Sequence, residues 1–130
     1  MQKSILYLSK IVASIIMLQT LYYKFSGSEE SVFIFSTLGI EPYGRIGIGV
    51  LELIASILIF VPTLSWIGAL LTIVLMSGAI FSHIFMLGFV VQNDGGYLFS
   101  LALIVLLSSF WILWKEKASF IMFLRNIKLM

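Results

Sequence analysis

The sequence has no cysteine, a single histidine and few charges: aspartate, glutamate, lysine and arginine together make up 11% of its 130 residues. Without cysteine, the chain forms no disulfide, performs no thiol exchange and binds no metal or cluster through sulfur. With one histidine, it cannot ligate haem through two histidines of its own. No carboxylates lie near that histidine in the sequence, so we expect no metal site.

The few basic residues are spread singly along the chain. Eight lysines and arginines against six acidic residues give a net charge of +2. A surface that binds nucleic acid gathers its basic residues into a patch or a stripe. We therefore expect no nucleic-acid partner.

Apolar side chains, by contrast, are abundant. Hydrophobic residues make up 61% of the chain, and the mean hydropathy is +1.13. A small soluble domain exposes a large share of its surface and cannot hide this many apolar groups. The excess must face lipid. The lipid bilayer is therefore the expected surroundings of the chain, and residues 1–130 are expected to form a single membrane domain.

Four stretches come close to the roughly 20 apolar residues that a helix needs to cross a hydrocarbon core about 30 Å thick. A proline turn separates the second stretch from the third, and a polar, glycine-rich segment separates the third from the fourth, which makes each pair antiparallel neighbours. We predict an all-α membrane protein, an up-and-down four-helix transmembrane bundle. Its spans are expected at residues 5–25, 43–61, 65–88 and 96–114, with the two turns around Pro62 and at residues 92–96.

Two further helices are expected outside the spans. Between the first and second spans, Ser26 and Glu29 match the serine-x-x-glutamate pattern of a helix N-terminus, and Gly39 is suited to end the helix that follows. A short interfacial helix on the membrane surface fits this connector. Residues 115–130 mix basic and large apolar side chains, which predicts an amphipathic C-terminal tail along the membrane surface.

The distribution of charge predicts the orientation. Basic residues gather near both ends of the chain, and cytoplasmic flanks retain lysine and arginine. We expect a multi-pass protein of the bacterial cytoplasmic (inner) membrane with both termini in the cytoplasm. The residues concerned are Lys3, Lys10, Lys115, Lys117, Arg125 and Lys128, against Glu29, Glu30, Glu41 and Asp94 on the opposite side.

Several polar residues lie inside or at the ends of the predicted spans, where ionisable groups are costly and rarely face lipid. Counted at about 1.5 Å per residue from the outer surface, all of them fall in the outer half of the bilayer. Lys24 and Arg45 lie near that surface, His83 about 8 Å below it, Gln19 about 9 Å below it and Glu52 roughly 14 Å below it.

Helical spacing gathers these residues onto two faces. Intervals of four, three and four place Arg45 and Glu52 on one face of the second span, and His83 belongs to a similar face of the third. Small residues on these faces let helices approach closely. We predict an interior polar site, closed from above by Lys24 and Asp94. The faces comprise Arg45, Gly49, Glu52 and Ser56, and Thr72, Met76, Ala79 and His83.

Such a site permits two interpretations. A buried carboxylate such as Glu52 needs a compensating cation, and beside an imidazole it can relay protons or hydrogen-bond a quinone. The alternative is structural: the cluster locks helices in register, the basic side chains reach the headgroups, and Asp94 caps the fourth helix. The candidates for ligand binding or proton relay are Lys24, Arg45, Glu52, His83, Gln19 and Asp94, and no catalytic residue is assigned.

Three short motifs follow one another along the chain. They are lysine-phenylalanine-x-glycine at residues 24–27, leucine-glutamate-leucine at residues 51–53, and methionine-serine-glycine-alanine-isoleucine at residues 76–80 with His83 after it. Together they resemble the DoxX family of small four-span membrane proteins. The resemblance extends from about Leu18 to Trp114, and the positions that match by residue are Lys24, Glu52 and His83.

This resemblance implies a four-helix membrane bundle in a redox setting. The family's namesake is a subunit of a thiosulfate:quinone oxidoreductase, and other members are associated with redox complexes or oxidative-stress responses. The related MauE group often carries cysteines, and their absence here argues against thiol transfer.

We therefore expect a quinone-linked subunit or accessory protein rather than an enzyme acting alone. Quinone is the one cofactor in view, and other membrane subunits or a second copy of the chain are the expected partners. The alternatives are a non-enzymatic scaffold or assembly factor of a larger membrane complex, and proton or small-solute transport by an oligomer.

Overall fold

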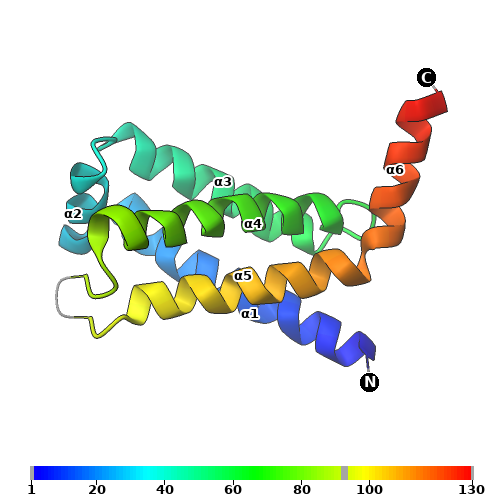
Figure 1. Ribbon diagram of the computed structural model, residues 1–130, viewed down its shortest axis with the longest axis horizontal. Helices are drawn as coiled ribbons and strands as arrows, with labels where there is room; N and C mark the ends of the chain where they lie inside the picture. Colours follow the sequence, from blue (N-terminus) through cyan, green and yellow to red (C-terminus); the bar gives the residue numbers. More distant parts are fainter. Residues whose placement is uncertain (1, 92–93, 130) are drawn as a thin grey trace.

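The computed structural model describes residues 2–91 and 94–129, which form helices joined by short connections and contain no strand (Figure 1). The all-α prediction is confirmed. Each predicted span coincides within a few residues with a helix, although the third ends in a π-helical turn. The elements are α1 (Gln2–Ser26), α2 (Glu29–Thr37), α3 (Tyr43–Ile59), α4 (Ser65–Ser82), the π-helical turn η1 (His83–Leu87), α5 (Tyr97–Lys115) and α6 (Lys117–Leu129).

Three helices in the described part of the chain are long and apolar enough to cross a membrane. They cover Lys3–Ser26, Ser65–Leu87 and Tyr97–Lys115, with 24, 23 and 19 residues. The remaining long helix, α3, has 17 residues. The chain is thus an α-helical membrane protein whose surface contacts lipid.

The four long helices lie side by side (Figure 1). α4 packs against α3 and α5, and α1 packs against the same two helices, so the four contacts close a ring. Alanines are prominent among the buried residues, and small side chains let neighbouring helices approach closely. The core consists of Ala13, Met17, Ala55, Ile59, Ala69, Met76, Ala102, Val105 and Ile112.

α3 and α4 approach each other closely at Gly68. A Cβ atom at this position would lie 2.6 Å from the backbone nitrogen of Ile59 and 2.9 Å from the carbonyl oxygen of Ala55. Both contacts are with backbone atoms, so no side-chain movement would relieve them. Glycine at this position is therefore what allows the two helices to pack at this distance.

The connector between α1 and α3 folds as a helix that begins two residues later than predicted. Ser26 is the last residue of α1, and Gly27 ends that helix with a φ of +69°. Ser28 is the N-cap of α2, because its hydroxyl accepts a hydrogen bond from the Ser31 amide at 3.2 Å. Gly39, with a φ of +78°, follows the end of α2 as predicted. α2 packs onto α1, α3 and η1, with Ser31 and Phe35 buried.

The N-terminus and α6 lie at the same end of the bundle, opposite to α2 (Figure 1). α6 is a separate helix, because the residue between it and α5, Glu116, is not helical. The predicted tail helix is confirmed over Lys117–Leu129, while Met130 lies outside the described residues. Gln92 and Asn93 of the predicted polar break also lie outside them, and Asp94, Gly95 and Gly96 form the turn that leads into α5.

We predict that Gly68→Ala destabilises the protein by about 1–3 kcal/mol, since the new methyl group overpacks the contact between α3 and α4. Thermal unfolding in detergent measures this change. Gly78→Ala is the matched control on the same helix, because a Cβ there meets nothing within 4 Å. The control should leave the melting temperature unchanged or raise it slightly. Equal melting temperatures for the two variants would show that the close approach is unimportant.

Candidate functional site

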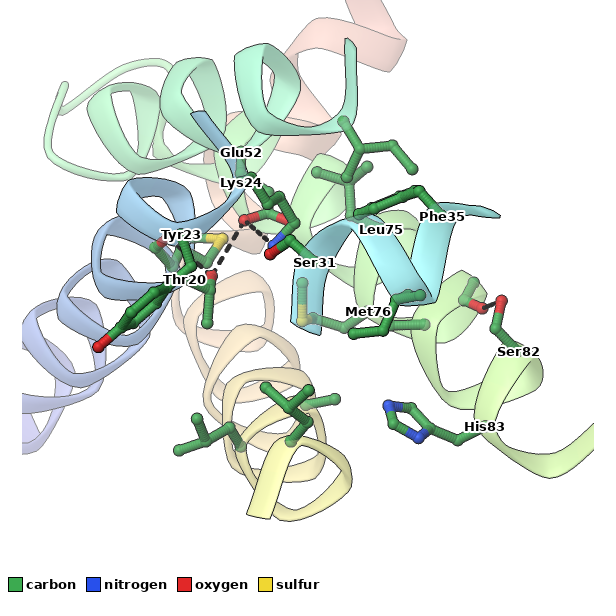
Figure 2. Close-up of a pocket in the computed structure, with 18 of the residues that line it drawn as sticks. Thr20, Tyr23, Lys24, Ser31, Phe35, Glu52, Leu75, Met76, Ser82 and His83 are labelled. Atoms are coloured by element: carbon green, nitrogen blue, oxygen red, sulfur yellow. Dashed lines mark hydrogen bonds and ion pairs between the residues drawn. The ribbon is translucent and has the colours of Figure 1, made fainter. Parts of the chain in front are cut away.

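A cavity of about 520 Å³ occupies the end of the bundle that α2 covers. Its wall is mostly apolar and is built by α1, α4 and α5, with α2 across it and a small contribution from α3. Figure 2 shows several of the polar side chains that line it, among them Lys24, Glu52 and His83. The polar and charged residues that line the cavity are Gln19, Thr20, Tyr23, Lys24, Ser28, Glu30, Ser31, Glu52, Ser82, His83 and Tyr97.

The charged centre of the cavity is an ion pair between α1 and α3. Lys24, in the last turn of α1, places its Nζ 3.1 Å from Oε1 and 3.3 Å from Oε2 of Glu52. The hydroxyl of Thr20, one turn earlier on α1, donates to Oε2 of Glu52 at 3.3 Å (Figure 2). Glu52 is only 3% exposed. A carboxylate buried this deeply persists as an ion only with such partners, so Lys24 and Thr20 are what permit it there.

Arg45 anchors the end of α1 from outside the cavity. Its Nη1 donates to the carbonyl oxygen of Lys24, one of the carbonyls that the end of a helix leaves without a partner. Its Nε lies 2.9 Å and 3.0 Å from the two carboxylate oxygens of Glu41. Arg45 thus ties α1 to the start of α3 and fixes the position from which Lys24 reaches Glu52.

His83 stands at the junction of α4 and η1 and is 5% exposed. Its Nδ1 lies 3.0 Å from the carbonyl oxygen of Gly88. The ring of Phe99 packs edge-on against the imidazole, with 5.6 Å between the ring centroids. Because a carbonyl oxygen only accepts, Nδ1 carries the proton in this hydrogen bond. When the imidazole with this tautomer carries no second proton, its Nε2 atom is an acceptor on a ring that lines the cavity (Figure 2). π-helical turns occur frequently at functional sites.

Asp94 shapes the turn before α5. Its Oδ1 accepts hydrogen bonds from the amides of Gly96 at 2.8 Å and Val91 at 3.1 Å, and its Oδ2 accepts one from Leu98 at 3.2 Å. Burial acts to raise the pKa of Asp94, but these backbone hydrogen bonds outweigh it and hold the pKa below its ordinary value. The bond from Leu98 satisfies an amide in the first turn of α5, whose N-cap residue is Gly96, and the other two bonds hold the turn before the helix.

The structure therefore divides the six candidates. Gln19, Lys24, Glu52 and His83 line the cavity, with Gln19 exposed at its edge. Among the described residues, Arg45 and Asp94 do not line it, and their side chains hold backbone instead. Lys24 and Glu52 are brought into direct contact, while His83 projects from a different element of the wall.

Sequence reasoning missed Thr20 and the part that α2 takes in the site. Thr20 was detectable, because it precedes Lys24 by one helical turn and so shares its face. Ser31 and Phe35 were assigned to a helix on the membrane surface, yet both are buried and line the cavity. Nothing in the periodicity of so short a helix indicates which neighbours it packs against.

Apolar helices that enclose a cavity with buried charged groups define the chain as an α-helical integral membrane protein with a candidate ligand site. The model of the DoxX-like family matches residues 8–110, so the chain belongs to the DoxX-like family. The resemblance seen in the three sequence motifs is thereby confirmed. The matched segment includes Lys24, Glu52 and His83 and ends before α6. Neither the curated proteins nor the solved structures contain a match to the chain.

Glu30 on α2 also lines the cavity, and its pKa is shifted by its surroundings. Burial and, to a smaller extent, the negative charge of Asp94 raise the pKa of Glu30 above its ordinary value of 4.5. A raised pKa means that the folded state prefers the protonated carboxyl. The contribution of Glu30 therefore favours the fold below pH 4.5 and is lost as the pH rises through the folded-state pKa.

We predict that Glu30→Gln removes this loss of stability with rising pH. Melting temperatures in detergent between about pH 4 and about pH 8 should fall less with rising pH in the variant than in the wild type. Glu29→Gln is the control, since Glu29 is exposed and does not line the cavity. It should follow the wild-type profile. Identical pH profiles for wild type and Glu30→Gln would contradict the assignment.

Proposed function

We propose that this protein binds a quinone in the cavity and serves as a membrane subunit or accessory protein of a redox system. The observation that carries the proposal is the Lys24–Glu52 pair on the wall of an otherwise apolar cavity of about 520 Å³. Ligand sites of this kind combine apolar walls with a few polar groups that fix orientation. A quinone has matching chemistry, with an apolar ring and carbonyl oxygens at its edge.

The polar groups suit both redox forms of such a ligand. The Lys24 ammonium has three N–H donors, and Glu52 does not need all of them, so one can donate to a quinone carbonyl. Nε2 of His83 can accept a hydrogen bond from the hydroxyl of the reduced form. Reduction of a quinone consumes two electrons and two protons. In this proposal a partner redox subunit supplies the electrons, and Glu52 and His83 hold or pass the protons.

We also propose that α3 crosses the membrane in addition to α1, α4 and α5, which gives four spans in an up-and-down bundle. Its 17 residues extend about 26 Å at 1.5 Å per residue, close to the thickness of a hydrocarbon core. Basic residues concentrate near the two ends of the chain, which lie at the same end of the bundle (Figure 1), so in this proposal both termini lie in the cytoplasm of a bacterial cell and the protein resides in the inner membrane. The cavity then opens in the outer half of the bilayer.

Quinone binding can be tested with matched substitutions at the two ends of the bundle. The protein is purified with native lipid, its extract is analysed for quinone, and short-chain ubiquinone and menaquinone are titrated in detergent. We expect Glu52→Gln to weaken binding about 10- to 100-fold, because it removes the charge that holds the Lys24 ammonium in place as donor to the quinone, and a hydrogen bond from a charged group contributes about 1.5–3 kcal/mol.

Glu116→Gln is the control for this experiment. Glu116 also pairs with a lysine, Lys10, at 3.1 Å, but it lies near the opposite end of the bundle. This variant should lose stability and keep its quinone affinity. Thr20→Val, which leaves the ion pair in place, gives a milder readout if Glu52→Gln fails to fold. An extract without quinone, together with equal affinities in all three variants, would leave the cluster with a structural role only.

The number of spans can be tested with alkaline phosphatase, which is active only outside the cytoplasm. We expect active fusions after Gly39 and Gly95, and inactive fusions after Thr63 and at the C-terminus, because four spans alternate the sides. A green fluorescent protein should give the reciprocal pattern. Equal phosphatase activity after Gly39 and after Thr63 would mean that α3 does not cross.

A further inference from the structure

α6 leaves the ring of long helices and crosses its end. Figure 1 shows α6 running transverse to the four long helices and extending past the edge of the bundle. Two contacts fix its start: Lys10 of α1 pairs with Glu116 at 3.1 Å, and the ammonium of Lys117 lies 3.7 Å from the ring centroid of Trp114. Lys10 is buried, so this junction is held firmly. If the long helices run along the membrane normal, α6 lies in the plane of the bilayer surface.

One face of α6 turns toward the bundle. Trp66, at the start of α4, packs against Phe120 at 4.9 Å and against Phe123 at 5.2 Å between ring centroids. Residues four positions apart lie on the same side of a helix, so Leu124 and Ile127 continue this face. Both are exposed, at 43% and 51%. An apolar face at the edge of a membrane bundle meets acyl chains.

The charge of α6 has a single sign. Its 13 residues include Lys117, Arg125 and Lys128 and no aspartate or glutamate. Arg125 and Lys128 are exposed and lie in the C-terminal half of the helix. Basic residues on an interfacial helix are attracted to anionic headgroups over roughly a Debye length. The complementary partner is therefore negatively charged and lies in the plane of α6.

We propose that α6 is a docking surface for anionic phospholipids of the leaflet that faces the termini. Leu124 and Ile127 insert among the acyl chains, and Arg125 and Lys128 bind phosphate groups of the surrounding lipids. The contacts of Trp66 and Glu116 hold the helix at the depth where both can occur. Lipid binding at α6 does not depend on what occupies the cavity at the other end.

The cysteine-free chain allows a direct test in the full protein. Single cysteines at Leu124 and Asn126 occupy opposite faces, since two residues turn a helix by about 200°. Each is spin-labelled and reconstituted into vesicles of phosphatidylcholine with or without phosphatidylglycerol. We expect the Leu124 label to collide with oxygen, the Asn126 label to collide with a water-soluble nickel chelate, and the contrast to increase with phosphatidylglycerol.

Lipid preference is measured separately by native mass spectrometry of the full chain titrated with phosphatidylglycerol. We expect Arg125→Gln and Lys128→Gln each to weaken retention of this lipid about fivefold. The charge-conserving Arg125→Lys and Lys128→Arg should retain it. Equal retention of phosphatidylglycerol and phosphatidylcholine would overturn the proposal, as would equal nickel accessibility at the two labels. Shielding of the Leu124 label from both oxygen and nickel would also overturn it, because a protein partner would then cover α6.

Discussion

The buried carboxylate of Glu52 needs compensating partners, and the structure at one end of this protein supplies them. An ion in an apolar interior costs several kcal/mol unless partners compensate it, and here the partners come from another helix. Lys24 reaches Glu52 only if α1 stops at a fixed height beside α3. Arg45 secures that height through the backbone of Lys24, and Gly27 ends the helix immediately afterwards. One electrostatic requirement thus sets the length of α1 and its packing against α3.

The two ends of the bundle differ in how they treat polar groups. At the α6 end, Lys10 and Glu116 satisfy each other, and aromatic rings close the surface around Trp66. At the α2 end, the polar groups surround a space. The Lys10–Glu116 pair does not line the cavity, so a lysine–glutamate pair between helices can have a purely structural role in this protein. The cavity beside Lys24 and Glu52 is what makes that pair a candidate site.

Much of the fold was predictable, because a helix that crosses lipid requires a long apolar stretch of sequence. Long apolar runs give the helices, and the spacing of Gly49, Glu52 and Ser56 gives the buried face of α3. Lys24, Glu52 and His83 were also identifiable as candidate site residues, since ionisable groups within an apolar span are costly and rarely face lipid. The roles of Arg45 and Asp94 depend on which backbone atoms lie nearby, and the packing of α2 depends on three other elements. Such non-local contacts leave no periodic signal in the sequence.

The close approach at Gly68 has a mechanical consequence. At Gly68 the backbones of α3 and α4 are in contact, so no side chain lies between the two helices at that point and their sliding or rotation is restricted there. Glu52 and His83 both belong to these two helices or to their continuation. The opposite side of the cavity is covered by α2, which packs on the bundle through Ser31 and Phe35 and is joined to α1 and α3 by short connections. In the proposed function, the element able to admit a ligand is α2, the shortest α-helix of the described residues.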